Sequence, residues 1–91
     1  MLKVCKRSGN LENFSHQKLK TSLINTGHDM NLSLNQAEID VLVDDIEKKL
    51  ISIRGADGVT SSYEIRGAVL SVLRNMGFPR LARTYYENRF D

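Results

Sequence analysis

Basic side chains near both ends of the chain are the residues whose types and spacing could do chemistry. Lys6 and Arg7 close an alternating stretch, and Lys18 opens a helical pattern, where the helix dipole does not favour a cation. Ser62 stands at another expected helix start, where free backbone N–H groups can receive a phosphate, and Arg66 follows one turn later. Together these five residues suit an anionic, phosphorylated ligand.

The distribution of charge allows such a site without requiring it. Residues 1–20 hold five Lys/Arg against one acid, and residues 66–91 hold five arginines against two acids. If these two basic segments meet in the fold, they form a local anion site. The alternative is an ordinary solvated surface, because charged side chains are mostly exposed. The net charge of +2 does not favour a nucleic-acid partner.

Residues for catalysis are sparse. His16 and His28 lack a partner at helical spacing, and no HExxH, GxSxG or Walker-type motif occurs. Cys5 is the single cysteine, which excludes an intrachain disulfide or cysteine-built zinc site and indicates a reducing compartment. No apolar stretch has the length of a membrane span, and no secretory signal pattern is present. We therefore expect a cytoplasmic protein that is not an enzyme and does not bind a membrane.

A hairpin is expected to position the first of these cations. Alternation over residues 2–14 predicts two short strands that turn at residues 8–10, where Gly9 can take a positive φ. The same alternation places Lys6 on the side of Val4, so that a cation lies along an apolar face. A hairpin alone is unstable and must pack on another element.

Two helices should follow the hairpin. Ser15 is the expected N-cap of a helix that runs to Thr26 and that Gly27 ends. Ser33 is the expected cap of a longer helix. Its apolar positions fall at spacings of three and four, which predicts that they are buried: Ile39, Leu42, Val43, Ile46, Leu50 and Ile53.

Two more helices complete the expected fold. After the break at residues 55–58, residues 59–60 can add a third short strand, and Ser61 with Glu64 predicts a capping box. The third helix then runs to Met76, and Pro79 begins the fourth. Residues predicted to face inward from these helices are Ile65, Val69, Val72, Met76, Leu81, Tyr85 and Phe90. We expect an α+β fold over residues 1–91, one domain in which a small N-terminal β-hairpin packs over a four-helix bundle.

Three blocks of sequence resemble the ATP-cone family. This family is the regulatory nucleotide-binding domain of many ribonucleotide reductases and of the zinc-ribbon repressor of reductase genes. Its fold, a small sheet over four helices, agrees with the one expected above. The similar blocks are Val4-x-Lys6-Arg7-x-Gly9-x-x-Glu12-x-Phe14-x-x-x-Lys18-Leu19, Ser62-x-Glu64-Ile65-x-x-x-Val69 and Ala82-x-x-Tyr85-x-x-x-Arg89.

The resemblance implies a site for ATP or dATP, with Mg²⁺ on the phosphates. By similarity to the family, Lys6 and Arg7 hold the triphosphate and Lys18 reaches the nucleotide. Ser62 matches a small hydroxyl residue at the start of the third helix. Arg89 matches a cationic position late in the fourth.

The resemblance also implies a slot for the base. Glu12 falls where the family recognises adenine, and Phe14 and Leu19 bound the base pocket beside Val4. Arg66 stands where some reductases have a histidine near the sugar, so the choice between ATP and dATP stays open. In the hairpin turn, a serine replaces the family's usual Asp or Asn.

Structural alternatives remain for several of these positions. Phe14 and Leu19 can be plain core residues, and Glu12 can be the cross-strand partner of a hairpin cation. Ser61 and Ser62 can simply cap a helix.

The resemblance implies a non-catalytic regulatory domain. We expect it to couple nucleotide identity to self-assembly or to the binding of a reductase or regulator partner. One alternative is a small DNA-binding regulator that uses the arginines of residues 66–91 and whose DNA affinity falls steeply with salt. The other is a purely structural interaction domain.

Overall fold

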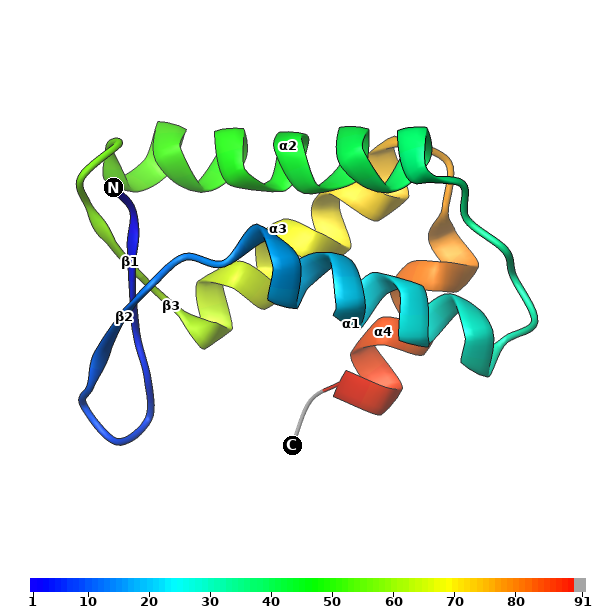
Figure 1. The fold of residues 1–91 in the computed structure, drawn as a ribbon, viewed down its shortest axis with the longest axis horizontal. Coiled ribbons are helices and arrows are strands. Elements are labelled where there is room, and N and C mark those ends of the chain that lie inside the picture. Colours follow the sequence, from blue (N-terminus) through cyan, green and yellow to red (C-terminus); the bar gives the residue numbers. More distant parts are fainter. Residues whose placement is uncertain (90–91) are drawn as a thin grey trace.

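Three short strands form one sheet at one end of the molecule (Figure 1). The computed structural model describes residues 1–89, and for residue 89 the backbone alone. Strand β1 (Lys3–Cys5) is central, with β2 (Leu11–Asn13) antiparallel on one side and β3 (Val59–Ser61) parallel on the other. The predicted hairpin and the third strand are therefore both confirmed.

The hairpin turn is longer than the sequence suggested. Lys6 donates its N–H to the Asn10 carbonyl at 2.9 Å, and Gly9 donates to the Lys6 carbonyl at 2.9 Å. Gly9 has a φ of +89°, which residues with a side chain rarely adopt. The register places Val4 opposite Glu12, and this pairing fixes which side chains share the face that meets the helices.

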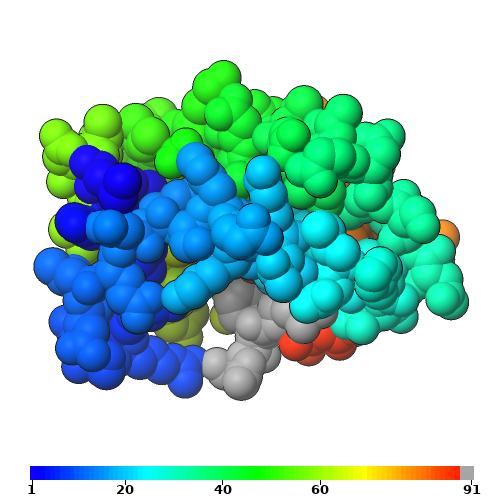
Figure 2. Space-filling view, in the orientation of Figure 1, coloured from blue at the N-terminus to red at the C-terminus, as the bar shows by residue number. Residues whose placement is uncertain are grey.

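Four helices pack beside the sheet: α1 (His16–Asp29), α2 (Gln36–Arg54), α3 (Ser62–Asn75) and α4 (Pro79–Arg89). Helices α1 and α3 each pack against both α2 and α4. On the face shown in Figure 2, α1 fills the middle, with the hairpin at one end and α2 along one side. The α+β class is confirmed. The buried core unites all four helices and the start of the chain: Leu2, Leu19, Leu23, Ile39, Leu42, Val43, Ile46, Leu50, Ala68, Val69, Val72, Leu73, Leu81, Ala82 and Tyr85.

Helix α1 begins as predicted but does not end at Gly27. Ser15 caps it by accepting the Lys18 N–H at 3.1 Å. The helix continues to Asp29, so the predicted end at Gly27 is wrong. A Cβ atom on Gly27 would lie 2.7 Å from the Leu32 carbonyl oxygen. Glycine is needed there because the following loop approaches the helix closely, and not because the helix stops.

The N-cap of α2 is Asn35, two residues after Ser33, the cap predicted from the sequence. Asn35 accepts the Glu38 N–H at 2.8 Å, and the Glu38 carboxylate accepts the Asn35 N–H at 3.0 Å. This reciprocal capping box satisfies two backbone donors at the start of α2. The predicted inward face is correct except for Ile53, which is 54% exposed. The last turn of α2 extends beyond the starts of α1 and α3 toward the sheet (Figure 1).

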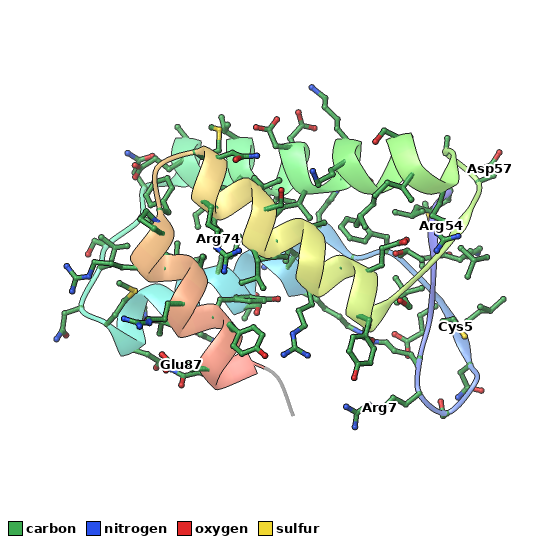
Figure 3. The ribbon with its side chains drawn as sticks, turned by 180° about the vertical axis from the view of Figure 1, so that it is seen from behind. Cys5, Arg7, Arg54, Asp57, Arg74 and Glu87 are labelled. Carbon is green, nitrogen blue, oxygen red and sulfur yellow. The ribbon has the colours of Figure 1, made fainter. Side chains whose placement is uncertain are left out.

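The capping box predicted for α3 is only half formed. Ser61 accepts the Glu64 N–H at 3.1 Å, but Ser61 also ends β3, where its backbone belongs to the sheet. The Glu64 carboxylate instead accepts hydrogen bonds from two nitrogens of Arg54, Nε and Nη2, and from the Thr60 hydroxyl. Arg54, labelled in Figure 3, lies where α2 ends beside β3. The same carboxylate therefore joins α2, β3 and α3.

The end of α3 and the course of α4 follow the prediction with one correction. Met76 is 44% exposed and not inward; α3 ends at Asn75, and Met76 is its C-cap. Pro79 is the first residue of α4, as predicted. Phe90, predicted to extend the apolar face of this helix, lies outside the described residues. No helix in the described part of the chain could span a membrane.

Candidate functional site

A pocket of about 230 Å³ opens where the hairpin, α1, α3 and α4 meet. Its wall contains eight of the ten residues that the sequence proposed for a site: Val4, Lys6, Glu12, Phe14, Lys18, Leu19, Ser62 and Arg66. Five further residues complete the lining: Asn13, Ser15, Ser22, Ile65 and Tyr85. The two basic segments of the chain thus meet at one cavity, which scattered surface charges would not do.

One carboxylate and two lysines form the polar rim of the pocket. Oε1 of Glu12 lies 3.4 Å from Nζ of Lys18 and 3.9 Å from Nζ of Lys6. Glu12 comes from β2, Lys18 from the first turn of α1, and Lys6 from the hairpin loop. Glu12 is thus a partner of the hairpin cation Lys6, as the alternative interpretation of this residue predicted. Because these pairs are long and exposed, they contribute little to stability, and an anionic solute can reach both lysines.

Apolar side chains line another part of the pocket. Val4 and Leu19 are buried, while Phe14 and Ile65 are half-buried, so the floor of the pocket is also the edge of the core. The interpretation of Leu19 as a core residue is therefore correct in part, because its side chain belongs to the core and also lines the pocket. The Phe14 ring meets the His16 ring edge to face at 5.5 Å between centroids.

The start of α3 supplies the third side of the pocket. Ser62 is the first residue of α3, is exposed, and lines the cavity, whereas Ser61 is the cap that accepts the Glu64 N–H. Of the two serines, one caps and the other faces the pocket. The first backbone N–H groups of a helix lack helical acceptors and carry the positive end of its dipole. This end of α3 is therefore suited to an anion, and Arg66 lies one turn further along.

This combination of a cationic rim, a helix start and an apolar wall agrees with comparison to known families. The family model for the ATP cone domain matches residues 2–90. The chain belongs to the ATP-cone family. ATP cones are regulatory, non-catalytic domains that bind adenine nucleotides. No curated protein sequence matches this ATP cone.

Two of the residues proposed for the site, Arg7 and Arg89, are not placed in the pocket wall by the described structure. Arg7 is exposed in the hairpin loop, and in Figure 3 its side chain leaves the loop on the side where the helices lie. The side chain of Arg89 lies outside the described residues. A role for either arginine in this ATP cone stays a prediction.

Some lining residues of this ATP cone were not proposed from the sequence. Ser15 and Ser22 share a face of α1 with Lys18, at spacings of three and four residues. That helical spacing was the signal that could have found them. Tyr85 was assigned to the core and is buried, yet its side chain also reaches the cavity.

His16, which lacked a partner at helical spacing, pairs through Nε2 with Oε1 of Glu47 on α2 at 2.9 Å.

Proposed function

We propose that this ATP cone binds ATP or dATP, with Mg²⁺ on the phosphates, in the pocket between the hairpin, α1 and α3. The observation that carries the proposal is the pairing of a cationic rim, Lys6 and Lys18, with the start of α3 and an apolar wall. A polyphosphate needs the first two features, and a flat base needs the third.

The phosphates would lie along the rim. Lys6 and Lys18 approach from the hairpin and from α1, and Ser62 offers a hydroxyl and backbone N–H groups from α3. Charge-assisted hydrogen bonds of this kind are roughly twice as strong as neutral ones. Glu12 is the one carboxylate among the described lining residues, so phosphate oxygens and water would provide most of the ligands of Mg²⁺.

The base would lie against the apolar wall. The cavity of about 230 Å³ is smaller than the roughly 300–1,000 Å³ of most ligand pockets, so it encloses a base better than a whole triphosphate. The Glu12 carboxylate can accept a hydrogen bond from the exocyclic amino group of adenine. Guanine presents a carbonyl at the same position, and two acceptors would repel each other. Adenine is therefore the expected base.

The output of binding would be a change of association. A nucleotide shifts an assembly equilibrium only by as much as it binds one state better than another. Since the family is regulatory, we propose that nucleotide identity controls self-association or partner binding, in the regulation of ribonucleotide reductase.

Isothermal titration calorimetry tests the binding proposal. ATP and dATP with Mg²⁺ should bind, AMP should bind more weakly because it lacks the outer phosphates, and GTP should be rejected. Absence of heat with both adenine triphosphates at millimolar concentration would contradict the proposal. Size-exclusion chromatography with each nucleotide tests the output, and one elution volume in every case would contradict the coupling to self-association.

A further inference from the structure

We propose that Tyr63 and Tyr86 are positioning residues that hold Arg66 toward the bound phosphates and report pocket occupancy at the protein surface. The inference rests on the proposed function, because it names residues that tune the same site. Neither tyrosine lines the pocket. The route that we propose for an effect of these rings on nucleotide affinity is a neighbour that does line the pocket.

That neighbour is Arg66. Its guanidinium carbon lies 4.4 Å from the centroid of the Tyr86 ring and 5.8 Å from that of Tyr63. Both distances fall within the roughly 6 Å range of cation–π attraction. Tyr63 stands in the first turn of α3 and Tyr86 on α4, so rings from two helices restrain one guanidinium.

Stacking and phosphate binding use different parts of the Arg66 side chain. A guanidinium meets aromatic rings through its flat faces, whereas its N–H groups point outward in the plane. Arg66 is half-buried and lines the pocket in this same stacked arrangement. It can therefore donate to a phosphate while it stays on the rings. Holding a long side chain in place beforehand removes part of the entropic cost of binding.

The rings are open to solvent on their other sides. Tyr63 is 74% exposed and Tyr86 is 50% exposed. A phosphate that fixes Arg66 would also fix the two rings, which changes the surface that a second molecule meets. Coupling of this kind is reciprocal, so contact with the rings would change nucleotide affinity by the same factor.

Replacement of both rings tests the inference. In calorimetry with Mg²⁺ATP, Tyr63→Leu/Tyr86→Leu should bind about 5–30-fold more weakly than the wild type, the scale of two exposed cation–π contacts. The matched control Tyr63→Phe/Tyr86→Phe keeps both rings and should bind within about twofold of the wild type. Equal losses in the Leu and Phe variants would overturn the inference, since hydroxyls and not rings would then matter.

A double-mutant cycle separates positioning from a general structural effect. In an Arg66→Gln background the ring replacements should cause no further loss of affinity, because the positioned group is gone. The same fold-loss in both backgrounds would overturn the inference while leaving the proposed function intact. Failure of the wild type to bind ATP would overturn both. Because Tyr63 is largely exposed and Tyr86 is half-exposed, the Leu variants should fold, and each single replacement should show about half of the double variant's loss in binding free energy.

Discussion

Two glutamates in this molecule meet cations in contrasting ways. Glu64 receives a forked pair of hydrogen bonds from Nε and Nη2 of Arg54, both at 2.9 Å, and its side chain is 20% exposed. Glu12 lies 3.4 Å from Nζ of Lys18 and 3.9 Å from Nζ of Lys6, and its side chain is 44% exposed. The first carboxylate is satisfied within the fold, and the second is only loosely paired.

The difference separates the scaffold from the site. Glu64 also accepts the hydroxyl of Thr60 at 2.8 Å, and these contacts join the ends of α2 and β3 to the start of α3. Their strength keeps α3 in place, so that its first turn faces the pocket. Glu12 balances the charge of two lysines without holding them, so a ligand with more negative charge can recruit both. Under the proposed function, the tight Arg54–Glu64 pair belongs to the architecture and the loose pairs of Glu12 belong to recognition.

Removal of a rim lysine should have the largest effect on binding. Lys6→Ala is expected to weaken Mg²⁺ATP binding by about 1.5–3 kcal/mol, the scale of a hydrogen bond to a charged group. Its free energy of unfolding should stay within about 0.5 kcal/mol of the wild type, because long exposed ion pairs stabilise little. Calorimetry and urea unfolding measure the two quantities.

Lys48→Ala is the matched control for the lysine experiment. Lys48 is exposed on α2, pairs with Asp44, and does not line the pocket. Its replacement should leave affinity unchanged. If Lys6→Ala and Lys48→Ala lowered affinity equally, general charge attraction would explain binding, and Lys6 would have no local role.

Removal of the tight carboxylate should act on stability instead. Glu64→Ala leaves the Thr60 hydroxyl, in a residue only 2% exposed, without this acceptor, which costs about 1–3 kcal/mol of unfolding free energy. Urea unfolding at neutral pH measures the loss. Glu12→Ala is the matched control and should cost less than about 0.5 kcal/mol. A larger loss for Glu12→Ala than for Glu64→Ala would reverse the assignment of scaffold and site.

Much of the proposed nucleotide site could be predicted from the sequence, because its residues from the hairpin and α1 are close along the chain. Alternation placed Lys6 beside Val4, and the N-cap at Ser15 fixed the start of α1, so Lys18 followed. Local rules govern each of these steps. The meeting of the two basic segments at one pocket was expected only from the resemblance, since no local rule says how α3 packs against the hairpin.

Contacts between residues that are distant in the sequence could not be predicted from local rules. The Ser61–Glu64 pattern predicts a capping box, but Arg54 from another helix offers the carboxylate a forked partner. The stacking of Arg66 on Tyr86 joins residues twenty positions apart and depends on how α3 meets α4. Sequence patterns do not show when a residue from another element competes for a side chain.

The smallest expected effect is a pH dependence carried by the tight pair. Hydrogen bonds from Arg54 and Thr60 lower the pKa of Glu64 below its ordinary value of 4.5. A carboxyl group whose pKa is lowered by folding stabilises the fold fully above the unfolded value, and this contribution disappears as pH falls through the lowered value. The stability difference between the wild type and Glu64→Gln should therefore be constant near neutral pH and shrink below about pH 4.5. Urea unfolding from pH 7 to pH 3 measures this stability difference. A difference that grows on acidification would show that the ionised Glu64 carboxylate does not stabilise the contact between α2, β3 and α3.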